Sequence, residues 1–144
     1  MLRQVNPLLS PDLLHILASM GHGDDLVIVN ANFPGDKIAR KAGARYTRLD
    51  GAPAPEVLRA VLEHLPVDDF VKDPFHVMQV PDPKPPILSE FETIIRDVAD
   101  HPAELTSIDR FAFYDRASTA YAVVQTGERR LYGNIIIKKG IIRL

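Results

Sequence analysis

The sequence predicts an α/β fold with a largely parallel sheet and an antiparallel element near the C-terminus. Two observations lead to this prediction. Short apolar runs rich in β-branched residues alternate with amphipathic segments of helical period over most of the chain. The chain also has 144 residues without an internal repeat or a linker, which fits a single domain, residues 1–144, with one hydrophobic core.

The first predicted elements are a helix and a buried strand. Ser10 can cap the helix, and Pro11 stands at its first position, where the missing N–H is no loss. We expect this helix to end at His22, with a neighbouring glycine as its left-handed cap. The run DLVIVNA that follows is apolar and β-branched, and it is long enough for a buried strand.

The middle of the chain continues the alternation. Residues 35–43 predict a short helix or a loop, and residues 46–49 predict a small strand that an Asp-Gly turn closes. Residues 54–65 are amphipathic and predict a helix, and residues 75–80 predict another strand. The segment PDPKPP, residues 81–86, holds four of the chain's 12 prolines and predicts an extended connector.

Two helices and two strands are expected after the proline-rich segment. One helix begins at Ser89, and the segment SIDRFAFYDRAS, residues 107–118, predicts another. Residues 120–140 predict two strands joined by a polar turn that contains Gly127.

The composition is that of a globular protein, and it excludes several kinds of binding site and protein class. Hydrophobic residues make up 46% and charged residues 25% of the chain. The 17 basic and 19 acidic residues leave a net charge of −2, which argues against non-specific binding to nucleic acid. Cysteine is absent, so disulfides and thiolate metal sites are excluded. The N-terminus lacks the apolar region of a signal peptide, and no stretch reaches the ~20 apolar residues of a membrane span, so we expect a cytoplasmic protein without membrane contact.

The stretch MGHGDDLVIVNANFP, residues 20–34, holds the first candidate site residue. His22 stands between two glycines, and two interpretations remain open for it. It is either a passive residue in the connection after a helix or a proton-transfer group. Flanking glycines let the backbone approach a ligand, and the ordinary pKa of histidine suits proton exchange near neutral pH.

The polar residues around this strand also allow two interpretations. Asp24 and Asp25 are expected to be solvated turn residues, with a catalytic role as the alternative. Asn30 and Asn32 stand at the end of the strand, where buried amides need hydrogen-bond partners. They either brace the loop or bind hydroxyl groups.

Metal and nucleotide motifs are missing. The five histidines are scattered without metal-ligand spacing, and no phosphate-binding loop or nucleophile elbow is present.

The last third adds a second group of candidates. Arg110 begins RFAFYDRA, a segment in which a charged group lies along a partly aromatic face. Tyr132, Gly133 and Asn134 directly precede a buried strand. A hydroxyl, an approachable backbone and an amide could bind a polyol, although a simple turn explains the same residues.

Three stretches together resemble one family. LLSPDLLHILASMGHGDDLVIVNANFP, RFAFYDRA and TGERRLYGNIIIKKG are similar to the fucose mutarotase and ribose pyranase family, in particular to its fucose branch. The similarity extends from about Leu8 to Gly140, with the blocks in the family order. The resemblance implies a three-layer α/β/α arrangement with a Rossmann-like sheet. It also implies a ring-shaped homo-oligomer, an octamer or a decamer, with active sites near subunit contacts.

The resemblance also implies an activity and its residues. The family interconverts the anomers of a monosaccharide, fucose or a related aldose, by opening and closing the pyranose ring without a cofactor. His22 matches the proton-transferring histidine, and Asp68 and Arg110 match substrate-binding residues. The motif of Tyr132, Gly133 and Asn134 matches residues that contact the sugar through side chain and backbone. Tyr132 is the candidate for the complementary acid or for orienting the anomeric oxygen.

One position departs from the family pattern. Where the family usually has an aspartate that contacts the sugar, this chain has Asn30. An amide still binds a hydroxyl, but it cannot act as a base. We therefore keep two hypotheses: a mutarotase in which His22 transfers the proton, and a non-catalytic monosaccharide-binding protein of the same fold.

Overall fold

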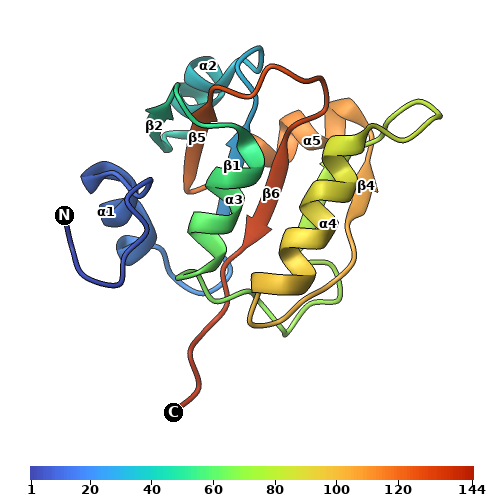
Figure 1. Cartoon of the computed structure of the whole chain (residues 1–144). Coiled ribbons are helices and arrows are strands. Elements are labelled where there is room, and N and C mark those ends of the chain that lie inside the picture. Colours follow the sequence, from blue (N-terminus) through green and yellow to red (C-terminus); the bar gives the residue numbers. More distant parts are fainter.

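A computed structural model describes residues 1–144 as eleven elements around one mixed sheet (Figure 1). The helices are α1 (Pro11–Ser19), α2 (Gly35–Ala42), α3 (Ala54–Leu62), α4 (Pro86–Val98) and α5 (Arg110–Ala117). The strands are β1 (Asp25–Val29), β2 (Arg45–Leu49), β3 (Phe75–Met78), β4 (Thr106–Ile108), β5 (Ala122–Thr126) and β6 (Ile135–Lys138).

The six strands follow the order β2-β5-β1-β6-β3-β4. Strand β6 is antiparallel to both of its neighbours, β1 and β3, whereas the other pairs are parallel. The predicted α/β fold, largely parallel with an antiparallel element near the C-terminus, is confirmed. The last two strands are not neighbours, however, because β1 lies between them. Their connection crosses the end of β1, where Ala31 N donates to Glu128 O at 2.8 Å.

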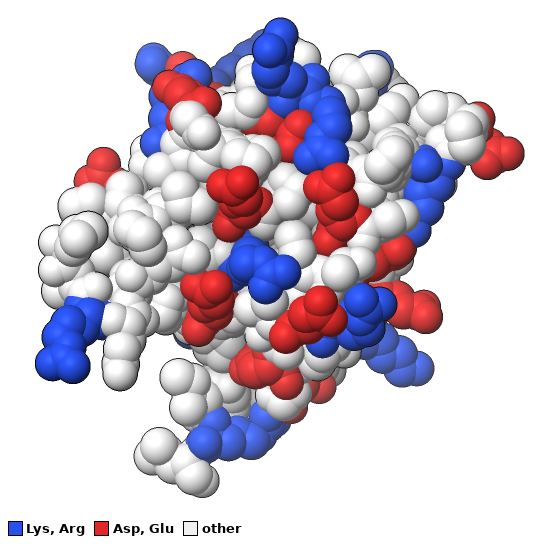
Figure 2. Space-filling model, in the orientation of Figure 1, with Lys and Arg blue, Asp and Glu red and all other residues white.

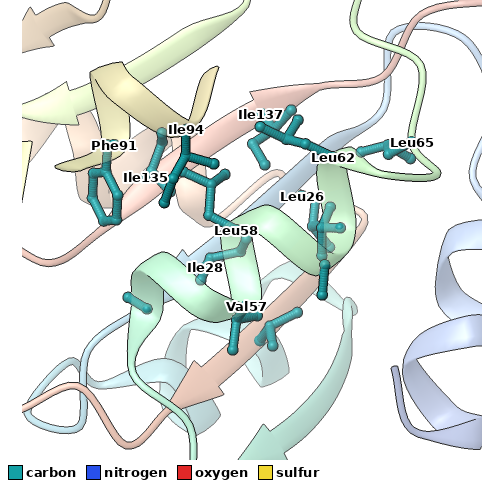
Figure 3. Packing of buried hydrophobic residues seen from close by; sticks show 14 of the residues in the cluster. Leu26, Ile28, Val57, Leu58, Leu62, Leu65, Phe91, Ile94, Ile135 and Ile137 are labelled. Atoms are coloured by element: carbon teal, nitrogen blue, oxygen red, sulfur yellow. The ribbon is translucent and has the colours of Figure 1, made fainter. Parts of the chain in front are cut away.

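Helices cover both faces of the sheet, which gives the three layers that the resemblance implies (Figure 1). Helices α1, α3 and α4 contribute to a cluster of 27 buried residues on one face. Helices α2 and α5 contribute to a cluster of 11 on the other face. Figure 3 shows the larger cluster, in which α3 and α4 side chains pack on strand residues that include Leu26 and Ile28 of β1.

The strand sequences explain why both faces are buried. Successive side chains of a strand point to opposite faces, so an unbroken apolar run suits a sheet covered on both sides. In β1, Leu26 and Ile28 belong to the larger cluster, and Val27 and Val29 belong to the smaller one. In β6, which reads IIIK, the isoleucines alternate in the same way.

Helix α1 is shorter than the sequence predicts. Ser10 caps it, accepting from Leu13 N at 3.2 Å, but the helix ends at Ser19 rather than at His22. Met20 takes an extended conformation while its side chain is buried in the core. No glycine caps the helix. Gly23 has a φ of +84°, in the left-handed region that favours glycine, but it lies in the following loop.

Two later boundaries also differ from the predictions. Helix α4 begins at Pro86, three residues before Ser89, because a proline is tolerated at the first helical position. Residues 107–118 are not one helix, since β4 ends at Ile108 and α5 begins at Arg110. Asp109 separates them, and its side chain accepts hydrogen bonds from two N–H groups of the first turn.

The surface over α3 and α4 mixes both signs of charge. Figure 2 shows blue and red side chains interspersed over this face, with a paler area over α1 and the N-terminal segment. No helix of the structure combines the length and apolar character that a membrane crossing requires.

Candidate active site

His22 lies in the loop between α1 and β1. Gly21 N donates to Asp24 Oδ2 at 2.7 Å, so the carboxylate of Asp24 closes the turn itself. Gly23 N donates to Lys139 O at 2.8 Å, which fastens the loop to the residue after β6. The His22 side chain remains 44% exposed. The Asp24 carboxylate and the main chain of Lys139 therefore hold the loop, while the imidazole stays open to solvent.

The partner of His22 is Asp68, in the segment that follows α3. His22 Nε2 lies 3.1 Å from Asp68 Oδ1, and the Asp68 side chain is 3% exposed. The same oxygen accepts from Phe70 N at 3.1 Å, and the Phe70 ring centroid lies 5.0 Å from that of the imidazole. Because a carboxylate only accepts hydrogen bonds, Nε2 carries the proton in this pair. Nδ1 of the same ring has no hydrogen-bond partner within the chain.

Four other predicted residues form a second cluster, which lines a pocket of about 240 Å³. They are Asn30, Arg110, Tyr132 and Asn134. Aromatic side chains form part of the wall, with Phe33 and Tyr114 stacked at 5.2 Å between ring centroids. Pockets of this character, part aromatic and part polar, suit small polar ligands that also have apolar faces.

Arg110 reaches this pocket from the start of α5. The cap formed by Asp109 fixes the beginning of the helix, with Oδ1 accepting from Phe111 N at 3.0 Å and from Ala112 N at 3.1 Å. Arg110 is exposed, and its guanidinium lies over the Phe111 ring at 5.1 Å. The cation is therefore available to bind hydroxyl groups at the pocket mouth.

The loop before β6 has an unusual backbone. Tyr132 has a φ of +65°, which few residues other than glycine adopt, and Asn134 N donates to its carbonyl at 2.8 Å. Gly133 has no room for a side chain, because a Cβ there would lie 2.8 Å from Glu128 Cγ and 2.8 Å from Ile87 Cδ1. Such backbone strain is typical of functional sites.

Asn30 braces this loop. Its N–H donates to Asn134 Oδ1 at 2.9 Å, and its Nδ2 donates to Arg130 O at 3.1 Å. Its Oδ1 accepts from Asn32 N at 3.1 Å, and its side chain is buried. Of the two interpretations of Asn30, the geometry favours the brace, since both of its polar side-chain atoms have protein partners.

A buried acid that the sequence did not single out supports the same loop. Glu128 is 3% exposed and accepts from the N, Nε and Nη2 atoms of Arg130, each at 2.9 Å. Arg130 also reaches Glu90 on α4. Hydrogen bonds from Arg130 lower the pKa of Glu128 below its ordinary value and outweigh the opposing effect of burial. The only sequence signal was a charged run after a strand.

The two clusters lie at opposite ends of the central strands β1 and β6. His22 precedes β1, and Asp68 pairs by its N–H with the end of β6. Asn30 follows β1, and Tyr132 precedes β6. Since β1 has five residues, about 16 Å of strand separates the clusters. One chain brings His22 to Asp68 and Arg110 to Tyr132, but it does not join the two pairs.

A network of charged side chains lies next to the His22 loop. Asp25 accepts from Arg116 Nε at 3.0 Å and Nη2 at 3.2 Å, and from Lys138 Nζ at 2.9 Å. Arg116 Nη1 also lies 2.7 Å from Nδ1 of His76, whose Nε2 lies 3.2 Å from Asp73 Oδ2. The expectation that Asp25 is a solvated turn residue is wrong, since its side chain is 11% exposed.

The network shifts two pKa values. Burial raises the pKa of Asp25, but hydrogen bonds from Arg116 and Lys138 outweigh it and hold the pKa below the ordinary 3.8. Burial and the charge of Arg116 lower the pKa of His76 below the ordinary 6.5, although Asp73 opposes them. No three His, Cys, Asp or Glu side chains gather closely enough to hold a metal ion.

Comparison with known proteins agrees with this architecture. A model of the RbsD / FucU transport protein family matches residues 3–142. The chain belongs to the RbsD/FucU family. Within this family, the human protein named fucose mutarotase is 46% identical over 99% of this chain and 96% of its own length.

Two solved structures of RbsD/FucU proteins are similar in fold. The fucose mutarotase of Streptococcus pneumoniae in complex with L-fucose is 36% identical, with a TM-score of 0.90 over 99% of this chain and 100% of its own. The Bacillus subtilis RbsD complexed with D-ribose has a TM-score of 0.77 over 99% and 100% of the two chains. At 20% identity, that second likeness concerns the fold alone.

Proposed function

We propose that this protein is a sugar mutarotase, an isomerase that interconverts the α and β anomers of L-fucose or a related aldose without a cofactor. The observation that carries the proposal is the half-exposed imidazole of His22, hydrogen-bonded to the buried carboxylate of Asp68. Relatives named fucose mutarotase and the likeness to a structure that holds L-fucose support the same activity.

Mutarotation needs two proton transfers to open the ring and two to close it, and it leaves the composition of the sugar unchanged. A proton leaves the anomeric hydroxyl, whose oxygen becomes a carbonyl oxygen. The bond between the anomeric carbon and the ring oxygen breaks, and its electron pair goes to the ring oxygen, which takes up a proton. Rotation about the neighbouring carbon–carbon bond and closure by the reverse steps give the other anomer.

In this reaction His22 is the proton-transfer residue. Asp68 fixes the orientation of the imidazole and stabilises its protonated form, and Nδ1 faces the sugar. Asp68 also belongs to the proposed sugar-binding set, at the floor of the site. Positioned proton transfer of this kind typically accelerates a reaction ~10²–10⁴-fold.

The second cluster holds the sugar and supplies the complementary acid. Of the anomeric and ring oxygens, His22 exchanges a proton with one, and Tyr132 donates a hydrogen bond to the other or orients it. Arg110 and the Asn134 amide bind the remaining hydroxyl groups of the sugar. The backbone at Gly133 lets the sugar approach closely. Asn30 lines the same pocket and keeps this loop closed.

A complete site then requires two copies of the chain. Because about 16 Å of strand separates His22 from Tyr132 within one copy, we propose that His22 of one subunit meets Tyr132 of another, in a ring-shaped octamer or decamer. Large apolar side chains next to both clusters support contacts there. Phe70 is 63% exposed, Phe111 is 69% and Leu131 is 66%.

The first test is saturation-transfer NMR on the anomeric protons of L-fucose, with ribose and galactose for comparison. We expect the protein to accelerate the exchange between anomers and His22→Ala to abolish the acceleration. His64→Ala, at an exposed histidine outside both clusters, is the matched control. No acceleration of any sugar above the spontaneous rate would overturn the proposal.

A mixing experiment tests the shared site. His22→Ala and Tyr132→Phe are each expected to be inactive alone. When the two are refolded together, about a quarter of the sites regain both residues, and activity returns in proportion. A mixture that stays inactive although mass measurement shows mixed assemblies would contradict a site built from two subunits.

The second candidate function is a non-catalytic monosaccharide-binding protein. Asn30 favours it, since an amide stands where the family usually has an aspartate. This alternative predicts saturable broadening of the sugar signals without faster exchange, and no recovery of exchange in Asn30→Asp.

A further inference from the structure

Lys138 connects the two segments that supply His22 and Asp68. It is the last residue of β6, and its side chain is 22% exposed. Its carbonyl accepts from Asp68 N at 3.0 Å, and its Nζ donates to the Gly23 carbonyl at 3.1 Å. Gly23 directly follows His22, so a single residue contacts the chain on both sides of the His22–Asp68 hydrogen bond.

The ammonium group of Lys138 is itself fixed in place. It donates to Asp25 Oδ1 at 2.9 Å, and Arg116 holds the same carboxylate through two hydrogen bonds. Arg116 is in turn fixed by His76. The lysine therefore bridges two acceptors, the Gly23 carbonyl and the Asp25 carboxylate. If its ammonium were removed, Arg116 would still hold Asp25, but the Gly23 carbonyl would lose its donor and nothing would tie it to that carboxylate.

We propose that Lys138 is a positioning residue for the mutarotase reaction: its ammonium holds the Gly23 carbonyl against β6 and so keeps the His22 imidazole on Asp68. This inference rests on the proposed function, in which His22 moves the proton. Lys138 does not contact the sugar in this scheme. It acts through the loop, because a displacement of about 1 Å at a catalytic group can lower a rate 10²-fold.

Lys139 provides a matched control at the next position. Its Nζ donates to the adjacent Gly140 carbonyl at 3.3 Å and to no group of the His22 loop. It contacts that loop through its main chain alone, with its N donating to Asp24 O at 2.9 Å. Removing its ammonium changes the charge by the same amount as removing that of Lys138, but it leaves the loop contacts in place.

The kinetic test compares Lys138→Met, Lys138→Arg and Lys139→Met. We expect kcat for anomer exchange to fall about 10- to 100-fold in Lys138→Met, with KM changed less than about twofold. Lys138→Arg, which keeps a donor for both acceptors, should restore most of kcat, and Lys139→Met should match the wild type. Unchanged kcat in Lys138→Met, or equal losses in Lys139→Met, would overturn the proposal.

A second measurement is independent of activity. The rings of His22 and Phe70 lie close enough, at 5.0 Å between centroids, for a nuclear Overhauser effect between their protons. We expect this signal to weaken in Lys138→Met and to persist in Lys139→Met. If the wild type accelerates no sugar, the proposed function fails while this signal still tests Lys138. If Lys138→Met does not fold, Lys138→Gln takes its place, and a signal of full strength in it contradicts the inference.

Discussion

His22 Nε2 lies 3.1 Å from Asp68 Oδ1, although 46 positions separate the two residues in the sequence. Neither residue belongs to a helix or a strand. Both are instead held by main-chain hydrogen bonds to the same end of β6, where Gly23 N donates to Lys139 O and Asp68 N donates to Lys138 O. The pairing of imidazole and carboxylate therefore depends on one central strand.

Replacing Asp68 by asparagine should lower kcat for anomer exchange about 10- to 100-fold. The amide still accepts a hydrogen bond, but it no longer stabilises the protonated imidazole. Saturation-transfer NMR measures the effect. Asp69→Asn, at an exposed neighbour that pairs with Arg143, is the control and should keep the wild-type rate. Equal rates in the two variants would show that the Asp68 charge is not used.

Replacing Asn30 by aspartate should destabilise the protein by about 1–3 kcal/mol at pH 7. The variant places a carboxylate oxygen where Nδ2 now donates to the Arg130 carbonyl at 3.1 Å, so two acceptors would face each other. Urea unfolding gives the free energy of unfolding. The control is Asn32→Asp, because the Asn32 side chain is exposed. An Asn30→Asp variant as stable as this control would show that the Asn30 side chain does not stabilise the loop before β6.

Replacing Asp25 by asparagine should cost about 1–3 kcal/mol of stability at pH 7, because Arg116 and Lys138 would lose a partly buried charged partner. The folded-state pKa of Asp25 lies below the ordinary 3.8, so its contribution is present above about pH 4. It is lost as the pH falls through the lowered pKa. The difference in the free energy of unfolding between the wild type and Asp25→Asn should therefore disappear in strong acid.

Urea unfolding at pH 7 and in acid measures this gap. Asp115→Asn, an exposed position on the same helix as Arg116, should show no gap at either pH. A gap for Asp25→Asn that stays constant into strong acid would contradict the role of its charge.

His76 should make the free energy of unfolding fall as the pH drops below 6.5. Burial and Arg116 lower its pKa in the folded state below the 6.5 of the unfolded chain, so the unfolded state binds the proton first. The stabilisation is present above pH 6.5 and is lost as the pH falls toward the lowered pKa. His76→Gln should flatten this part of the curve, by at most about 1.4 kcal/mol per pH unit.

The control for this pH dependence is His64→Gln, at an exposed histidine, which should keep the wild-type slope. Both variants keep Asp73, Arg116 and Asp25 around position 76, so the comparison between them isolates the His76 imidazole. If His76→Gln retains the full slope, the titrating group lies elsewhere.

The sheet could be predicted from the sequence because its strands carry a strong local signal. Residues 25–29 and 135–138 are almost wholly apolar, and such continuous apolar runs are typical of strands buried on both faces. Strand β4 was missed because it has three residues, which is too short for any period to show. The order of the strands was also inaccessible, since nothing local says that β6 inserts beside β1 rather than β5.

The candidate site could be predicted residue by residue but not as an arrangement. Glycines around His22 and the YGN motif are local signals. That the two lie at opposite ends of the central strands follows only from the antiparallel direction of β6. The burial of Asp25 was unpredictable for a related reason, because its partners Arg116 and Lys138 lie 91 and 113 positions away.

The position of β6 also affects how the chain reaches its final shape during synthesis. Strands β2, β5 and β1 form one half of the sheet, β3 and β4 form the other, and β6 joins them. Until residues 135–138 emerge from the ribosome, both halves present an unpaired apolar edge, which can pair with another chain. Nascent chains of this protein should therefore depend on chaperone protection until their last strand arrives.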